Sequence, residues 1–149
     1  MKKNDSELFE KMRIAGKLAA RTLDELTSFV KPGVTTNFLD KICYEYIKDH
    51  GGNSAPLYYK GFPKSCCTST NHIVCHGIPS EKVLKDGDIM NVDVTVFIDN
   101  HHGDTGRMFC IGDISVKSKN LISTTYESMM RAISIIKPGI KLGDIGATI

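Results

Sequence analysis

Several signals that would assign the chain to a broad class are missing from its 149 residues. No apolar run approaches the ~20 residues that a membrane-spanning helix needs, so a transmembrane bundle is excluded. Lys plus Arg number 19 and Asp plus Glu number 17, a balance that argues against nucleic-acid binding by phosphate neutralisation. Two lysines follow Met1, but no apolar stretch comes after them, and a secretory signal is not expected.

The cysteines form an odd set without CxxC spacing: Cys43, Cys66, Cys67, Cys75 and Cys110. Such a set is typical of reduced thiols rather than of a disulfide framework, so we expect a cytoplasmic protein. His72 and His76 have H-x3-H spacing close to three of these cysteines, which keeps a structural zinc site as a minor alternative.

The composition, 41% hydrophobic and 24% charged, suits one globular domain with a substantial core. Apolar residues at steps of three and four predict a helix over 6–30, which Asp5 or Ser6 would cap, and another over 36–50. A later helix is expected over 121–136, with five apolar residues placed inward: Leu121, Met129, Met130, Ile133 and Ile136.

The middle of the chain predicts β-structure. Residues 55–83 mix prolines and glycines with aromatic and β-branched residues, which indicates short strands joined by loops. Residues 89–98 alternate between apolar and polar side chains and predict a strand, which follows a turn at 85–88. The chain is expected to turn at 99–102, with His101 and His102 exposed, and to return as a partner strand over 103–111.

A short internal repeat suggests a duplication. Residues 30–34 (VKPGV) recur as residues 136–140 (IKPGI), and each copy follows a long amphipathic helix and precedes a second one. The sequence therefore predicts two related halves. Residues 1–112 would hold two helices and an antiparallel sheet, and residues 113–149 only the helical start of the second half.

Asp93 and Asp104 are the leading candidates for chemistry, because aspartate is a poor strand residue. A two- or four-residue turn would place both carboxylates on one face of the hairpin as diagonal neighbours, ~7–8 Å apart between backbones. A shared divalent cation would remove their mutual repulsion. A solvated polar face, which Asn91 and Thr95 would suit, stays as the alternative.

Two weaker signals lie upstream. His76 precedes a glycine near a strand–loop boundary, where it could act as a proton donor or substrate partner, although a lone histidine is more often structural. Tyr59, Phe62 and Cys67 cluster where glycine and proline fix the backbone, and they could line an apolar pocket or simply belong to the core.

Four segments together resemble type I methionine aminopeptidases of the bacterial kind: residues 59–65 (YKGFPKS), 71–79 (NHIVCHGIP), 86–95 (DGDIMNVDVT) and 102–105 (HGDT). The resemblance extends over essentially the whole chain. It implies the α/β pita-bread (creatinase/aminopeptidase-like) fold and removal of the initiator methionine from nascent proteins by hydrolysis. It also implies two divalent metal ions per complete site, with Co, Mn, Fe and Zn all compatible. The expected partners are nascent polypeptide N-termini, without nucleic acid or membrane, and association with the ribosome stays open.

The resemblance also assigns roles. Asp93 matches a bidentate ligand of one metal, Asp104 the carboxylate that bridges both, and His76 a catalytic residue that contacts the substrate. Tyr59, Phe62 and Cys67 match the pocket for the methionine side chain.

The family completes its metal site with a histidine and two glutamates from the second half, and no counterpart of these occurs in the sequence. We therefore expect a truncated, poorly active form. A proline-specific peptidase of the same fold and a non-catalytic remnant or peptide- and protein-binding module are the alternatives.

Overall fold

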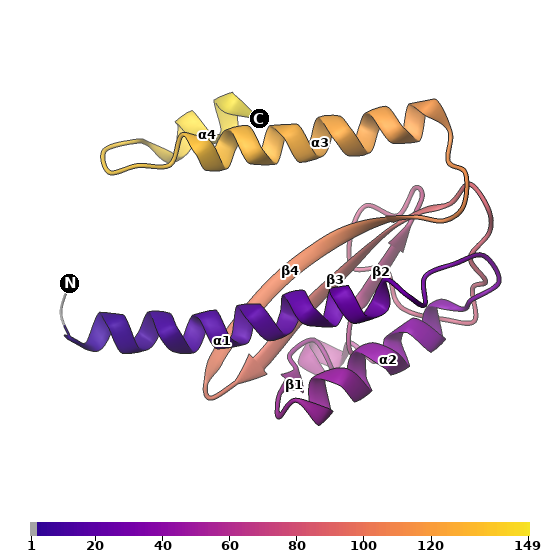
Figure 1. Ribbon diagram of the computed structural model, residues 1–149, viewed down its shortest axis with the longest axis horizontal. Coiled ribbons are helices and arrows are strands. Elements are labelled where there is room, and N and C mark those ends of the chain that lie inside the picture. The colour runs from indigo at the N-terminus through magenta and orange to yellow at the C-terminus, as the bar shows by residue number, and fades with distance from the viewer. Residues whose placement is uncertain (1–2) are drawn as a thin grey trace. The chain divides into compact units, whose positions relative to one another are not determined.

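The computed structural model describes the backbone of residues 3–149 and the side chains from Asp5 onward (Figure 1). The chain forms two compact units, the first ending at Asp113 and the second covering Ile114–Ile149. In the part of the chain described, no helix combines the length and apolar character needed to cross a membrane.

The first unit contains one antiparallel sheet of four strands. Its long central strand, β3 (Ile89–Ile98), has the predicted bounds and pairs along its whole length with β4 (His101–Cys110). The other edge of β3 pairs with two short strands in succession, β1 (Asn53–Ser54) and β2 (Cys67–Thr70). Of the two, only β2 lies within residues 55–83, where short strands joined by loops were predicted, and β1 precedes that range.

The β3–β4 turn has the shorter of the two lengths expected for it. Ile98 pairs directly with His101, so the turn consists of Asp99 and Asn100 alone, with φ angles of 48° and 62°. Asp and Asn tolerate this left-handed conformation, which a two-residue type I′ hairpin turn requires at both positions. The prediction that His101 and His102 lie in an exposed turn was wrong, because both belong to β4.

Two helices cover one face of this sheet. Helix α1 (Lys3–Leu26) packs against β3 and β4, and α2 (Thr36–Asp49) packs against α1 and β1 (Figure 1). The alternation of β3 places fully buried valines on this face, which join the core residues of both helices: Val92, Val94, Val96, Leu18, Leu23, Leu39 and Ile47. The opposite face of the sheet, which carries the polar residues of β3, remains free for a site.

The predicted helix bounds need small corrections. Helix α1 begins at Lys3, so Asp5 and Ser6 lie inside its first turns and not ahead of its start, as predicted for a cap. It ends at Leu26 rather than residue 30, and in the turn that follows Phe29 and Val30 both donate to the Leu26 carbonyl. Helix α2 begins where predicted, capped by Thr35, whose hydroxyl accepts from the amide of Phe38 at 3.2 Å.

The two Pro-Gly junctions have the same local structure. Val34 donates to the Lys31 carbonyl at 3.4 Å, and Ile140 donates to the Lys137 carbonyl at 3.3 Å. The glycines, Gly33 and Gly139, have φ angles of 90° and 98°, as the third position of a type II turn requires. The repeated motif therefore forms the same junction twice, while a duplication of complete halves stays a prediction.

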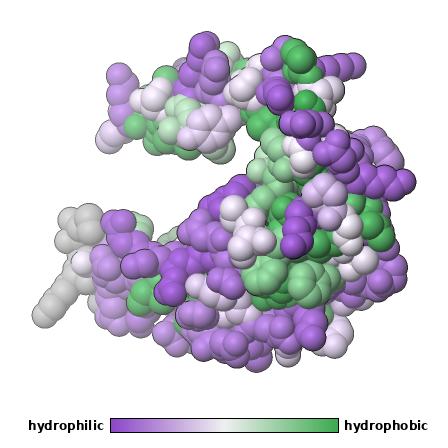
Figure 2. Space-filling model, turned by 45° about the vertical axis from the view of Figure 1, so that its right-hand side comes forward, coloured by the Kyte–Doolittle hydropathy of each residue, from purple (hydrophilic) through white to green (hydrophobic). Residues whose placement is uncertain are grey.

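The second unit contains α3 (Val116–Ser134), the second Pro-Gly turn and α4 (Leu142–Thr148). Helix α3 begins before the predicted residue 121, because the Ser115 hydroxyl accepts from the Ser118 amide at 3.1 Å and caps it. The prediction that five apolar residues of this helix face inward was wrong, because all five are exposed. Their exposed fractions are 60% for Leu121, 47% for Met129, 44% for Met130, 53% for Ile133 and 59% for Ile136. Apolar side chains, green in Figure 2, lie on the surface of this unit because it contains no sheet that could cover them.

Candidate metal and peptide site

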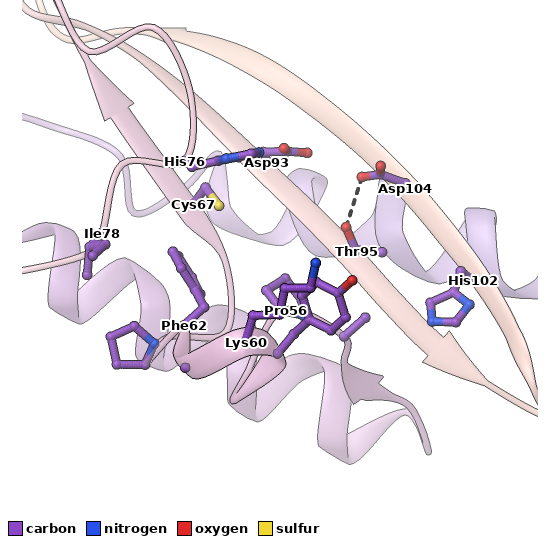
Figure 3. A pocket seen from close by; sticks show the side chains of 14 residues that line it. Pro56, Lys60, Phe62, Cys67, His76, Ile78, Asp93, Thr95, His102 and Asp104 are labelled. Atoms are coloured by element: carbon purple, nitrogen blue, oxygen red, sulfur yellow. Dashed lines mark hydrogen bonds between the residues drawn. The ribbon is translucent and has the colours of Figure 1, made fainter.

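A pocket of about 920 Å³ opens on the sheet face that the helices leave free. Residues of β2, β3 and β4 form one wall, and the segment between β1 and β2 forms the other. In the view of Figure 3, Cys67, Phe62 and Ile78 lie toward one side, and Thr95, Asp104 and His102 lie toward the other. Every residue predicted to take part in chemistry lines this pocket: Tyr59, Phe62, Cys67, His76, Asp93 and Asp104.

The two aspartates project from one face of the β3–β4 hairpin. Asp93 pairs with Gly106, and Asp104 pairs with Thr95, so the carboxylates are diagonal neighbours with the predicted parity. Thr95 Oγ1 also donates to Asp104 Oδ1 at 3.0 Å (Figure 3). This hydrogen bond orients the Asp104 carboxylate.

Electrostatics in the pocket disfavour a fully ionised carboxylate pair. Partial burial raises the pKa of Asp93, and the charge of Asp104 and a hydrogen bond between the two carboxyls raise it further. His76 opposes this change and lowers the pKa of Asp93 to a smaller extent. Two adjoining carboxylates in such surroundings fit a hard divalent cation, because the cation would neutralise the charge that the pair concentrates.

The ligand set within the described residues is nevertheless small. No group of three or more His, Cys, Asp or Glu side chains suited to a metal ion occurs in residues 3–149. The two aspartates therefore provide part of a divalent-metal site. The same observation gives no support to the minor alternative of a zinc site at His72, His76 and the nearby cysteines.

A hydrogen-bonded loop holds His76 at the pocket. Thr68 donates to the carbonyl of Gly77 at 2.8 Å, and the Gly77 amide donates to Ser69 Oγ at 3.1 Å. A Cβ atom on Gly77 would lie 2.2 Å from the Thr68 carbonyl oxygen, so only glycine permits this approach to β2. His76 itself has a φ of 53°, a left-handed conformation that its neighbours must maintain.

The other end of the pocket is apolar. Tyr59 lies in a single 3-10 turn, Tyr59–Gly61, and Phe62 follows directly. Burial raises the pKa of the Cys67 thiol to about 11, with a further contribution from the charge of Asp93. Cys67 therefore presents a neutral thiol at neutral pH, which suits contact with an apolar side chain better than nucleophilic chemistry.

Sequence reasoning missed two residues of this region. His102 lines the pocket beside Asp104, and its ring lies 4.8 Å from that of Phe97, centroid to centroid. The Asp99-Asn100 dipeptide, a favoured two-residue turn, was the signal that could have placed His102 in the strand. Asp40 supports the pocket from α2 and had no local signal, because its partners lie 25 and 26 residues away in the sequence.

Comparison with known proteins identifies the family of this chain. The model of metallopeptidase family M24 matches residues 10–149. Methionine aminopeptidase of Rickettsia prowazekii (strain Madrid E) is 59% identical over 141 residues, which cover 95% of this chain and 54% of that protein. Methionine aminopeptidase 2 of Mycobacterium tuberculosis is 51% identical over 143 residues, covering 96% of this chain and 50% of that protein.

A solved structure shows the same arrangement. The crystal structure of methionine aminopeptidase from Rickettsia prowazekii superposes with a TM-score of 0.94 at 57% sequence identity, and covers 96% of this chain and 58% of that one. The chain thus belongs to metallopeptidase family M24. Its fold is the predicted α/β pita-bread fold, and within the family its sequence resembles the bacterial methionine aminopeptidases. The chain spans about half the length of the relatives it matches.

Proposed function

We propose that this chain provides the substrate pocket and two carboxylate ligands of a metal-dependent methionine aminopeptidase. The observation that carries the proposal is the placement of Asp93 and Asp104 on one sheet face, beside an apolar pocket. Family membership implies a divalent metal cofactor, and the similarity to methionine aminopeptidases suggests the reaction.

In this proposal each part of the pocket has its own role. Asp93 and Asp104 hold divalent cations, two in a complete site, and Co, Mn, Fe and Zn all suit oxygen and imidazole ligands. When bound, such ions supply Lewis-acid activation of water for peptide hydrolysis. Tyr59, Phe62 and Cys67 receive the methionine side chain. His76 donates a hydrogen bond from its imidazole to the scissile peptide and stabilises the charge that develops there.

The proposed substrates are the N-termini of nascent polypeptides, which this protein would meet in the cytoplasm; association with the ribosome belongs to the same hypothesis. We propose that the 149-residue chain alone is poorly active, because two carboxylates bind a metal weakly. An assay with a Met-Ala-Ser peptide and added Mn²⁺ or Co²⁺ measures this directly. Turnover near that of whole methionine aminopeptidases would contradict it.

Metal binding tests the site itself. Titration of the chain with Mn²⁺, followed by electron paramagnetic resonance, should show weak binding that Asp93→Asn or Asp104→Asn abolishes. Asp49→Asn is the matched control, because Asp49 is an exposed carboxylate at the end of α2, away from the pocket lining. Equal Mn²⁺ binding by all four proteins would sink the proposal. A peptide-binding module without metal chemistry would instead bind Met-Ala-Ser equally well with Mn²⁺ and with a chelator.

A further inference from the structure

Asp40 is a buried carboxylate that lies outside the pocket lining. It projects from α2 and is 9% exposed. A buried charge is costly unless several hydrogen bonds compensate for its lost hydration. Such a residue needs an explanation when the proposed reaction makes no use of it.

The partners of Asp40 all come from one short segment. Its Oδ1 accepts from the amide of Ser65 at 2.8 Å, from Ser65 Oγ at 2.7 Å and from the amide of Cys66 at 3.1 Å. Ser65 Oγ also lies 3.0 Å from the backbone carbonyl oxygen of Asp40, and Lys64 Nζ lies 4.0 Å from Oδ2. Two consecutive backbone amides therefore converge on a single carboxylate oxygen, which fixes the path of the chain there.

This segment connects two walls of the apolar pocket. Phe62 and Pro63 line the pocket immediately before it, and Cys67 lines the pocket immediately after it. Both Phe62 and Cys67 line the pocket, and in the view of Figure 3 they lie on the same side of it. The α2 carboxylate thus holds the link whose two ends carry Phe62 and Cys67.

We propose that Asp40 is a positioning residue that sets the shape of the apolar subsite by fixing Phe62 relative to Cys67. The inference rests on the proposed function, in which this subsite receives the unbranched, flexible side chain of an N-terminal methionine. Without the Asp40 carboxylate, the Ser65 and Cys66 amides lose their common acceptor and the two walls move independently. The subsite then discriminates poorly between methionine and a smaller first residue.

The first test measures side-chain discrimination rather than stability. NMR titrations of the 149-residue chain compare its affinities for Met-Ala-Ser and Ala-Ala-Ser. An apolar pocket discriminates by roughly 10–200-fold for a single methylene, and methionine exceeds alanine by more than one such group, so the unaltered chain should prefer Met-Ala-Ser by at least that ratio. Asp40→Ala should remove most of this preference. Asp40→Asn keeps a side-chain oxygen that can accept from both amides, so this variant should retain much of the preference for Met-Ala-Ser. Asp49→Asn, again the control, should leave the ratio unchanged.

The second test needs no ligand. Alkylation of single cysteines, followed by mass spectrometry at one fixed pH, compares Cys67 in the pocket with Cys43 in the core, which are 7% and 0% exposed. Asp40→Ala should speed labelling of Cys67 at least several-fold relative to Asp40→Asn and leave Cys43 protected. Both variants remove the charge of Asp40, which contributes to the raised pKa of Cys67, so the difference between them reports the position of the thiol. Asp40→Ser, whose side chain is too short to reach both amides, replaces the alanine variant if that does not fold.

The outcomes separate the two proposals. If the unaltered chain binds both peptides equally, the methionine subsite is wrong, while the labelling pattern still decides whether Asp40 positions Phe62 and Cys67. If the unaltered chain discriminates and a folded Asp40→Ala protein discriminates equally well, the positioning role is refuted. Parallel gains in labelling at Cys43 and Cys67 would refute it as well, because they would indicate a merely structural role in anchoring α2.

Discussion

Replacing Gly103 with alanine should destabilise the first unit strongly, because α1 crosses β4 at this residue. A Cβ atom at Gly103 would lie 2.2 Å from the carbonyl carbon of Ala15 and 2.3 Å from the amide nitrogen of Gly16. Both atoms belong to the helix backbone, so no side-chain rotation can relieve the contact. Helix α1 would have to recede by about 1.2 Å to reach ordinary van der Waals distance.

The expected loss follows from what that movement disturbs. Overpacking a core typically costs about 1–3 kcal/mol, and displacement of a whole helix should bring Gly103→Ala to the upper end, at about 3 kcal/mol. That is a large part of the ~5–15 kcal/mol by which domains are usually stable. Urea denaturation followed by far-ultraviolet circular dichroism measures the change in the free energy of unfolding.

Gly16 offers a matched control from the same helix–strand crossing. A Cβ atom at Gly16 meets nothing within 4 Å, and glycine in a helix interior costs roughly 0.5–1 kcal/mol relative to alanine. Gly16→Ala should therefore raise the free energy of unfolding. If Gly103→Ala unfolds at the same urea concentration as the unaltered protein, α1 does not approach β4 as closely as described here.

Three smaller effects can be measured by the same method. Partial burial alone would raise the pKa of Asp88, but hydrogen bonds from Asn71 and the Lys85 amide outweigh it and lower the pKa. The ionised carboxylate therefore stabilises the fold at pH values above its unfolded pKa, and this stability is lost in acid. Acid should accordingly remove less stability from Asp88→Asn than from the unaltered protein. The pKa of Asp93 is raised in the folded protein, so its ionisation costs stability as the pH rises through that pKa. With a chelator present, Asp93→Asn should therefore be more stable than the unaltered protein at neutral pH. Lower stability of the variant would contradict the repulsion from Asp104. Arg107→Ala should cost less than about 1 kcal/mol despite its 2.7 Å contact with Asp24, because both side chains are exposed; a larger loss would show that this ion pair is worth more than surface pairs usually are.

Local patterns predicted the central elements well, because these elements are determined by their own residues. The strict alternation of residues 89–98 gave both bounds of β3 and the division between its buried valines and its polar face. The Pro-Gly pairs gave both turns that end the long helices, since few other dipeptides satisfy a type II turn. Features that depend on distant partners were not predictable, and Asp40 is the clearest case. An aspartate within a helix pattern is expected to be exposed, and its burial becomes evident only when the structure places Ser65 and Cys66 beside it.

The apolar stripe of α3 shows a different limit. Its spacing correctly predicted a helix, yet the inference that Leu121 and Ile133 face inward required a second surface, and periodicity contains no information about one. The Pro-Gly junction after α1 looks the same in sequence as the junction after α3, but α1 packs on β3 and β4 within its own unit. An amphipathic pattern therefore states which side chains can be buried, and only the tertiary structure states which are.

The carboxylate pair was predictable even though the length of its turn was left open between two and four residues, and the reason is the two-residue period of a strand. A turn of two residues pairs positions whose numbers sum to 199, as observed for Asp93 with Gly106, and a turn of four residues would give a sum of 201. The numbers of Asp93 and Asp104 sum to 197, which is odd like both of these sums, so the two residues share a face in either register. The error in the turn moved only His101 and His102 from the loop into the strand. A turn with an odd number of residues would have placed the two carboxylates on opposite faces, and no single cation could then bind both. The candidate site therefore depends on the parity of the hairpin, which Asp99 and Asn100 determine by adopting positive φ together.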